Sequence, residues 1–438
     1  MADEEMEVSS AHSSSSEDDE IVEDTEQEID SAPQVYLPDR PLEQGEELTC
    51  DLSAYLMYHQ AQTSAPCLSF DIIQDRLGAN RETFPLTAYL VAGTQAADSH
   101  VNNVIVMKLS NLQKTKNADS DNEDEELSDD EDDVSDPKMA GAMIKHMGCV
   151  NRIRSTVVQE TALAASWSEL GKVNIWDLTP QLQAVDSDQL LSQYNKDNKQ
   201  NSLKPVFTFT GHTTEGFAMD WSPTRPGVLA TGDCRKDIHI WKPTGSAWLV
   251  DQRPLIGHTN SVEDLQWSPN EPNVLASCSV DSSIRIWDTR AHPAEACMLT
   301  CNRAHESDVN VISWNRNEPF IVSGGDDGFL YVWDLRQFHR KSPLATFKHH
   351  TKSVTSVEWH PTDSAVFASG GSDNQIALWD LSLEKDAEAE EMEEVPPQLL
   401  FIHQGQNNIK ELHWHKQLTG VLISTAESGF NIFRTISV

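Results

Sequence analysis

The sequence predicts an all-β protein built as a β-propeller, because a long internal repeat divides it into short, strand-like segments. The chain has 438 residues and carries four tryptophans at equal intervals of 46 residues, each at the end of an apolar alternating run: Trp241, Trp287, Trp333 and Trp379. A second series follows a histidine by nine residues in each repeat: Trp221, Trp267, Trp314 and Trp359. Four short β-rich segments in a repeat of about 46 residues are typical of one propeller blade.

The individual strands are bounded by turn residues. In one repeat the expected strands are SVEDLQW, VLASCS and SIRIW, separated by Ser-Pro-Asn and Asp-Ser turns. The segments GH…WSP…LASCSVDSSIRIWD and AH…VSGGDDGFLYVWD resemble WD-repeats, which implies a closed ring of blades. Weaker blades are expected at about 84–112, 150–178 and 400–433, and in the last one Phe433 takes the place of the tryptophan. The total is seven blades, the usual number in this family.

The expected fold is therefore all-β, a seven-bladed WD-repeat β-propeller with an N-terminal helix and disordered acidic segments. We expect an acidic tail at 1–40, a helix and a blade-closing strand within 41–75, and the propeller at 76–438. The helix is predicted at Leu52–Gln62, because Leu52, Tyr55, Leu56 and His59 would share one helical stripe. The run Cys67–Phe70 is predicted to be the strand that completes the last blade.

Net negative charge is concentrated in three segments. The chain has 70 acidic and 32 basic residues, a net charge of −38. Residues 1–30 hold 13 acids, 119–136 hold 12 and 384–394 hold 7, while the rest of the chain holds 38 acids against 31 bases. Such segments are too polar and self-repelling to fold, so we expect a disordered insert at 113–140 and an acidic loop at 384–397. They are either simple solvated loops or, as we favour, devices that capture a basic partner at short range.

The same composition excludes several classes of protein. A net charge of −38 opposes unaided binding to bare nucleic acid or to an anionic membrane. No run of about 18 apolar residues and no secretory signal is present, so neither a transmembrane helix nor export is expected. Seven scattered cysteines without a CxxC pair indicate neither a disulfide framework nor a zinc site. Serines inside the acidic segments are candidate phosphorylation sites that would deepen the charge.

Three repeats contain a serine, a histidine and an aspartate together with a tryptophan, a combination that suggests a hydrolase triad. The sets are His258, Ser277, Asp281 and Trp287; His305, Ser323, Asp327 and Trp333; and His350, Ser369, Asp373 and Trp379. A catalytic site need occur only once, and no G-x-S-x-G elbow surrounds any of these serines. In WD-repeat proteins such a set is a buried structural tetrad. The blade ending at Trp241 has Arg235 where the aspartate is expected, so we predict that it lacks this network.

No other motif indicates an enzyme. His413 and His415 alternate on a predicted strand, but no third metal ligand accompanies them. Neither a Walker A loop nor a G-x-G-x-x-G motif is present. We therefore expect no catalytic residues, no metal and no cofactor.

The pairing of an N-terminal helix with an acidic, double-proline loop resembles the histone-binding WD-repeat chaperones related to the retinoblastoma-binding proteins. In that family a histone helix lies between these two elements. The resemblance implies a client-binding groove lined by Tyr55, Tyr58, Asp386, Glu390, Glu391, Glu393, Glu394, Pro396 and Pro397. The alternative is that the helix only packs on the side of the propeller.

The same family binds basic tails at the narrow end of its channel. The matching positions in this chain are Asn151, Glu215, Glu263 and Asn310. A further matching position holds Cys149 in place of an acid, which is a departure from the family pattern.

Over most of its length the chain resembles the family of glutamate-rich WD-repeat proteins. The segments that carry this resemblance include QVYLPDR, CLSFDI, EGFAMDWSP, VDQRPLIGHT, DVNVISW, LLFIHQG, KELHWH and FRTISV. The resemblance implies a non-enzymatic nucleolar escort for a basic client, the third ribosomal protein of the large subunit, in ribosome biogenesis, together with histone binding. It also implies a monomer in the nucleus and nucleolus, with chromatin and cytoplasm as further locations.

Two alternative functions stay open. One is a chromatin factor that binds histones in replication-origin licensing. The other is a substrate receptor of a cullin ubiquitin ligase, because WDTR and WDLR match the WD-x-R pattern that docks such receptors on the ligase adaptor. In that case Arg290 and Arg336 would make the contact, although an arginine after a strand-ending Trp-Asp is also common without this role.

Overall fold

Seven four-stranded antiparallel sheets form the structure, a computed structural model that describes residues 49–115, 136–200, 203–384 and 396–438. From the inner to the outer strand, the first three blades are β2 (Cys67–Ile73), β3 (Leu86–Thr94), β4 (Asn103–Leu112) and β5 (Lys138–Lys145); β6 (Val150–Val158), β7 (Thr161–Ser168), β8 (Lys172–Asp177) and β9 (Phe207–Phe209); and β10 (Ala218–Trp221), β11 (Leu229–Gly232), β12 (Ile238–Thr244) and β13 (Ala247–Val250).

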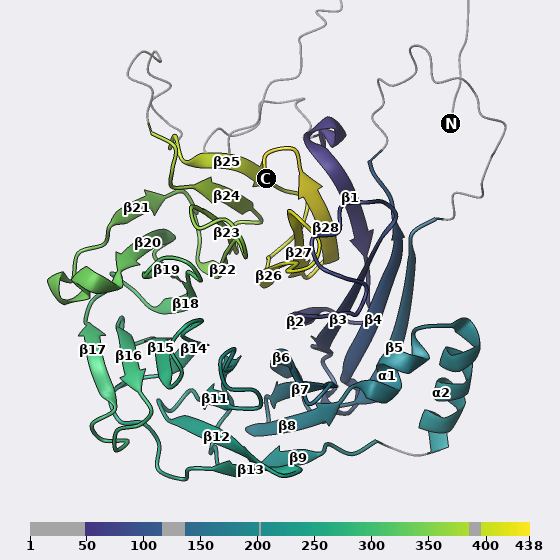
Figure 1. Ribbon diagram of the computed structural model, residues 1–438, viewed down its shortest axis with the longest axis horizontal. Coiled ribbons are helices and arrows are strands. Elements are labelled where there is room, and N and C mark those ends of the chain that lie inside the picture. The colour runs from purple at the N-terminus through teal and green to yellow at the C-terminus, as the bar shows by residue number, and fades with distance from the viewer. Residues whose placement is uncertain (1–48, 116–135, 201–202, 385–395) are drawn as a thin grey trace, which may run out of the picture. The chain divides into compact units, whose positions relative to one another are not determined.

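The remaining blades follow the same order. They are β14 (Val262–Trp267), β15 (Val274–Ser279), β16 (Ile284–Asp288) and β17 (Cys297–Cys301); β18 (Val309–Trp314), β19 (Phe320–Gly325), β20 (Phe329–Asp334) and β21 (Ala345–Lys348); β22 (Val354–Trp359), β23 (Val366–Gly371), β24 (Ile376–Asp380) and β25 (Leu399–His403); and β26 (Glu411–Trp414), β27 (Val421–Ala426), β28 (Gly429–Thr435) and β1 (Tyr55–Ala61). The inner strands contact one another in sequence around a common axis (Figure 1). The seven-bladed propeller is therefore confirmed.

The ring closes within blade 7, which combines strands from both ends of the propeller. β1 pairs antiparallel with β28, with Tyr58 opposite Phe433 and His59 opposite Ile432. Phe433 also lies opposite Leu422, the register that Trp287 has with Leu275 in blade 4, so it takes the tryptophan position as predicted. A chain that supplies one strand of its last blade from its N-terminal side cannot open the ring without breaking this pairing.

The helix predicted at Leu52–Gln62 is wrong. Only Leu52–Ala54 is helical, as the short 3₁₀ turn η1, and β1 begins at Tyr55. Tyr55 and Met57 are buried while Leu56 is exposed, so the burial follows the period of two of a strand rather than the helical stripe. Pairing with β28 decides the outcome, because tertiary contacts routinely override local propensity. The propeller accordingly starts at β1, before residue 76.

Two further boundaries differ from the prediction. Cys67–Ile73 forms a strand, but it is the innermost strand of blade 1 and does not complete the last blade; β1 has that role. The segment Leu399–His403, expected to open the last blade, is the outer strand of blade 6, and blade 7 begins at Glu411. Both errors follow from placing the blade-closing strand one element too late in the sequence.

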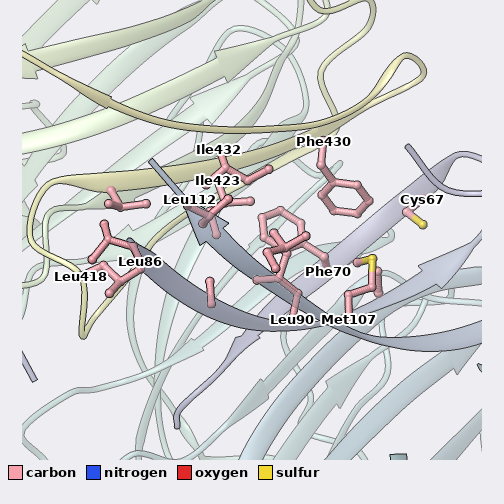
Figure 2. Packing of buried hydrophobic residues seen from close by; sticks show 14 of the residues in the cluster. Cys67, Phe70, Leu86, Leu90, Met107, Leu112, Leu418, Ile423, Phe430 and Ile432 are labelled. Carbon is pink, nitrogen blue, oxygen red and sulfur yellow. The ribbon is translucent and has the colours of Figure 1, made fainter. Parts of the chain in front are cut away.

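Apolar side chains fill the space between neighbouring blades. Figure 2 shows the cluster between blades 7 and 1, where Phe70 and Leu90 of blade 1 lie near Phe430 and Ile432 of blade 7. The rings of Phe70 and Phe430 meet edge to face with centroids 5.5 Å apart. The packing is close, because a Cβ added at Gly93 would lie 2.2 Å from the Val150 side chain of the next blade. Segments from the two ends of the propeller thus share one buried core.

Hydrogen bonds also join each inner strand to the next. The indole of Trp267 donates to the carbonyl of Asp220 (3.1 Å), and its backbone N–H donates to the Asp220 carboxylate (2.7 Å). The Trp414 indole and N–H make the same two bonds with Glu358, at 3.2 and 3.0 Å. The residue just before the tryptophan on each inner strand therefore holds the following blade.

The helices lie outside the regular blades. α1 (Thr179–Ala184) and α2 (Asp188–Gln200) are inserted between β8 and β9 and pack against β5, where the Tyr194 hydroxyl donates to the Met143 carbonyl (2.8 Å). Two 3₁₀ turns are η2 (Ser99–Val101) and η3 (Leu335–Arg340). No helix in the described ranges is long and apolar enough to cross a membrane.

Candidate binding sites on the propeller

Blades 4, 5 and 6 contain the hydrogen bonds expected of a structural tetrad. In blade 4, His258 bonds through Nδ1 to the Asp281 carboxylate (3.0 Å) and through Nε2 to Ser277 Oγ (2.6 Å), and the Trp287 indole donates to the same hydroxyl (2.8 Å). The corresponding bonds in blades 5 and 6 are 2.8–3.1 Å long. The three histidine side chains are completely buried.

This burial argues against the hydrolase interpretation. Each serine hydroxyl already contacts a histidine and an indole N–H, so its Oγ is not directed at a surface where a substrate could bind. Burial lowers the pKa of His258, while its hydrogen bond to Asp281 lowers the pKa of that carboxyl despite the opposing effect of burial. The arrangement is a neutral histidine that accepts or donates within a fixed network.

The prediction that the blade ending at Trp241 lacks a network is wrong. Its members are His212, Asp233, Thr231 and Trp241: His212 bonds to Asp233 (2.8 Å) and Thr231 Oγ1 (2.9 Å), and Trp241 donates to the same threonine (2.9 Å). Asp233 lies two residues after Thr231, whereas the aspartates of blades 4–6 lie four residues after their serines. The carboxylate comes from an earlier position of the turn, so a fixed offset overlooks it.

A reduced version of the network occurs in blade 2. His146 contacts Ser166 Oγ (3.0 Å), and the Trp176 indole donates to the same hydroxyl (2.9 Å). The carbonyl of Gly148 replaces the aspartate, at 2.9 Å from His146 Nδ1. The sequence contained a signal for this set, since Ser166 precedes Trp176 by the same ten residues as in the regular blades.

The end of the propeller at which the inner strands begin gathers carboxylates; we call it the axial face. Residues in equivalent positions there lie four residues before the tryptophan of each inner strand: Phe217, Glu263, Asn310, Thr355 and Lys410. Several of them reach the next blade, since Asn310 donates to the Val354 carbonyl (3.1 Å) and Thr355 to the Ile409 carbonyl (2.8 Å). Asn151 of blade 2 belongs to the same face and donates to Glu215 (2.9 Å).

Four carboxylates form a continuous arc on this face over blades 3–5: Glu215, Glu263, Asp308 and Asp326. Within the described ranges, none of them lies within salt-bridge distance of a cation. Burial raises the pKa of Glu263, with Asp308 adding to the shift, and burial together with Asp326 raises the pKa of Asp308. The four predicted residues Asn151, Glu215, Glu263 and Asn310 are thus brought together, whereas Asp308 and Asp326 were missed by the sequence reasoning.

Cys149, which stands where the family pattern has an acid, is not free to act as one. Its thiol lies 3.5 Å from the Ala96 carbonyl and 3.7 Å from the Asn102 side chain, and burial raises its pKa. The acidic arc therefore ends at blade 3 and does not continue over blade 2.

Below the axial face, Glu411 joins three consecutive blades in a buried charged network. One of its oxygens lies 2.5 Å from Arg152 and 2.6 Å from Arg154 of blade 2, and the other accepts from Ser69 Oγ (2.7 Å) and the Phe70 N–H (2.8 Å) of blade 1. Burial alone would raise the pKa of Glu411, but the two arginines hold it well below its usual value.

His413 extends this network to blade 6. Its Nδ1 lies 2.9 Å from Glu358, and its Nε2 lies 3.7 Å from Glu411. Burial alone would lower its pKa, but the two carboxylates raise it to about 9, so the imidazole is protonated at neutral pH. His415 is separate from this set, with its Nδ1 accepting the backbone N–H groups of Gln417 and Leu418. No cluster with the composition of a metal site occurs in the described residues.

Only part of the expected client groove can be located. Tyr55 is buried on β1, and its hydroxyl bonds to His403 Nδ1 (2.7 Å), so it belongs to the core between β1 and β25. Tyr58 is half-buried, with its hydroxyl bonded to Gln60 (2.5 Å) and Asn431 (3.3 Å). Pro396 and Pro397 lead into β25, and Pro397 is exposed. Asp386, Glu390, Glu391, Glu393 and Glu394 lie outside the described residues.

The two WD-x-R segments have the same geometry in adjacent blades. Arg290 and Arg336 each form a bidentate pair with the aspartate two residues earlier, Asp288 and Asp334. The arginine side chains are 72% and 63% exposed. Both guanidinium groups are therefore held in a fixed direction at the surface.

Comparison with known proteins places this geometry in a family. The family model for the histone-binding protein RBBP4, or for its counterpart in the CAF1 complex, matches residues 45–113, and the WD domain, G-beta repeat, matches 203–242, 250–288, 296–334 and 341–380. The chain is 44% identical over 412 residues to Glutamate-rich WD repeat-containing protein 1 of Dictyostelium discoideum, covering 90% of this chain and 83% of that one. It belongs to the glutamate-rich WD-repeat family.

Other members of the glutamate-rich WD-repeat family are similarly related over nearly the whole length. Ribosome assembly protein rrb1 of Schizosaccharomyces pombe is 41% identical over 94% of this chain and 87% of its own length. Protein HEAT STRESS TOLERANT DWD 1 of Arabidopsis thaliana is 42% identical over 91% and 90%, respectively. The match to the histone-binding model spans β1 to β4, the segment that closes the ring.

Proposed function

We propose that this protein is a non-catalytic chaperone of ribosome biogenesis that binds a strongly basic client and shields it from premature contact with RNA. The supporting observation is the acidic arc of Glu215, Glu263, Asp308 and Asp326, whose carboxylates have no cation within salt-bridge distance in the described ranges. Carboxylates gathered in this way favour a bound cation, because it relieves their mutual repulsion. The relative named as a ribosome assembly protein supports the assignment to this process.

The proposed client is the third ribosomal protein of the large subunit, with histones as a second class of client. The acidic segments 1–30, 119–136 and 384–394 would increase the rate of capture at short range, and the propeller would supply a shaped site. The match to the histone-binding family model supports the second class of client. This function would place the protein in the nucleus and nucleolus.

Binding of the purified ribosomal protein to variants of the full-length chain tests the role of the arc. We expect Glu263→Gln combined with Asp308→Asn to weaken binding about tenfold, since each lost exposed or partly buried contact with a cation is worth up to about 1 kcal/mol. Glu271→Gln combined with Glu295→Gln is the matched control, because both side chains are exposed elsewhere on blade 4 and the net charge changes equally. Equal loss in both double variants would contradict a shaped site.

The role of the acidic segments is tested separately by deleting residues 119–136. We expect slower association and a weaker dependence of affinity on salt, because the segment holds 12 acids. Competition between histone and ribosomal protein for the same sample would show which client binds more tightly. Unchanged association rate and salt dependence would mean that this segment only increases solubility.

A second candidate function, docking on a ubiquitin-ligase adaptor, is favoured by one observation. Arg290 and Arg336 are held in the same bidentate geometry and remain largely exposed on adjacent blades. Adaptor binding measured with Arg290→Ala, Arg336→Ala and the double variant tests this function. Full binding by the double variant would rule out this contact.

A further inference from the structure

The axial face is polarised, because the ring position occupied by Glu263 in blade 4 holds Lys410 in blade 7. Each residue lies four positions before the tryptophan of its inner strand, Trp267 and Trp414. Blade 7 is three blades away from blade 4 in a ring of seven, so the two residues stand on opposite sides of the axis (Figure 1). The acidic arc therefore faces a single cation across the axial face.

The local contacts place Lys410 at this end of the propeller. Its backbone N–H bonds to the Thr425 carbonyl (2.8 Å), and the preceding carbonyl, of Ile409, accepts from Thr355, which occupies the same ring position in blade 6. Its side chain is half-buried. No carboxylate in the described ranges lies within salt-bridge distance of its ammonium group, since Glu411, the next residue, is already engaged by Arg152 and Arg154.

The acidic arc also contains a buried polar group whose hydrogen bonding is incomplete. Ser261 lies beside Cys234 and Glu263 and is only 8% exposed, yet its hydroxyl completes no hydrogen bond of good geometry among the described residues. A buried hydroxyl in this state costs free energy unless a ligand or an ordered group supplies a partner. This observation, independent of charge, points to a ligand at the arc.

We infer that the axial face binds a client segment of mixed charge, with basic side chains on the arc and an acidic side chain on Lys410. This inference rests on the proposed function and makes it more specific, because it names the charge pattern and a specificity-determining residue. A purely basic segment would gain from the arc but would meet repulsion at Lys410. A segment with its basic residues at one end and a carboxylate at the other would satisfy both sides.

The test uses two labelled peptides and the full-length protein. One peptide carries four lysines separated by serines, and the other has the same lysines with two terminal serines replaced by glutamate, at several spacings. Binding is measured by fluorescence anisotropy at low and at physiological salt. We expect the mixed peptide to bind the wild-type protein at least as tightly as the basic one, despite its lower net charge.

Lys410→Glu should reverse this preference. We expect the ratio of the two dissociation constants to change about tenfold, with the basic peptide gaining affinity and the mixed one losing it. Lys410→Met should give about half of this effect on a logarithmic scale and controls for an unfolded Glu variant. Lys416→Glu is the matched control, because this exposed residue follows the opposite end of β26 and changes the net charge equally.

The outcomes separate this inference from the proposed function. If Lys410→Glu and Lys416→Glu raise the affinity for both peptides equally, only net charge matters and the inference is overturned. If the basic peptide binds but Glu263→Gln has no effect on it, the arc is not the client site and the proposed function fails at this face. Loss of affinity in Glu263→Gln, together with a preference that depends on Lys410, supports both.

Discussion

Blades 3 to 6 are joined by neutral hydrogen-bond tetrads, whereas blades 7, 1 and 2 share one charged network centred on Glu411. The tetrads use residues 18–23 positions apart in the same blade. The network around Glu411 uses residues 257–342 positions apart, from both ends of the propeller. The difference shows that repetition stabilises the middle of the ring, while its closure depends on contacts that occur only once.

The physical cost of the two solutions also differs. A tetrad buries groups that are uncharged or paired within one blade, so each blade can fold with its own network complete. The closure buries a carboxylate between two guanidinium groups, which is favourable only while all partners stay in place. We expect removal of one member of the closure to destabilise the whole ring more than removal of one member of a tetrad.

The largest expected effect is that of Glu411→Ala. This change leaves Arg152 and Arg154 buried without their carboxylate and should lower the free energy of unfolding by about 3–5 kcal/mol. Urea denaturation followed by tryptophan fluorescence measures it. Glu271→Ala, at an exposed position of blade 4, is the control and should change stability by less than about 0.5 kcal/mol. A loss below about 1 kcal/mol for Glu411→Ala would remove the proposed difference between the two regions.

A smaller loss is expected from Asp233→Ala in blade 3. The Asp233 carboxylate accepts from His212 and from the backbone N–H groups of Arg235 and Asp237 (both 2.9 Å), so its removal leaves three groups without an acceptor. We expect a loss of about 2–3 kcal/mol by thermal or urea unfolding. Arg235→Ala, at the position where sequence offset placed the aspartate, should be nearly neutral. The opposite ranking would mean that this blade has no working tetrad.

His413→Gln tests the closure network through its pH dependence. The folded pKa of His413 is raised to about 9, above the value of an exposed histidine, so its contribution to stability is complete below about pH 6.5 and is lost as the pH rises through 9. We expect a loss of about 2 kcal/mol at pH 6 that nearly disappears at pH 10. His415→Gln is the control, because burial lowers the pKa of His415 to about 3 and leaves it neutral at both pH values. A loss in His413→Gln that does not vary with pH would contradict the ionic role.

The same contrast explains how much could be predicted from the sequence. The fold and three tetrads are accessible because Trp287, Trp333 and Trp379 repeat at a fixed interval and their partners keep fixed offsets. Asp233 was missed because its turn moves the carboxylate by two positions while preserving the contact with His212. Offsets describe the backbone register, whereas the network requires only that an oxygen reach the histidine.

The closure was less accessible to sequence reasoning. Tyr55 and Leu56 fit a helical stripe, and only pairing with the distant β28 makes this segment a strand. Glu411 has no local pattern that announces Arg152 and Arg154, since they are brought together by the ring itself. On the axial face, Glu215 and Glu263 were found through the family resemblance, but Asp308 and Lys410 needed the relative positions of the blades.

The smallest expected effect is a gain, from Asp220→Asn at the border between the two regions. Asp220 lies on the inner strand of blade 3, and burial raises its pKa to about 7. Its carboxyl group ionises more readily in the unfolded chain, so the native state loses stability as the pH rises from about 4 to 7. Asparagine keeps an oxygen that accepts the Trp267 N–H (2.7 Å) but removes the buried charge. We therefore expect Asp220→Asn to raise the free energy of unfolding by about 1 kcal/mol at pH 8 and to leave it unchanged at pH 4. Urea unfolding at the two pH values measures this. A loss at pH 8 would instead show that the ionised Asp220 is stabilised by Arg154 of the neighbouring blade, and the charged closure would then extend one blade further than the contacts around Glu411 indicate.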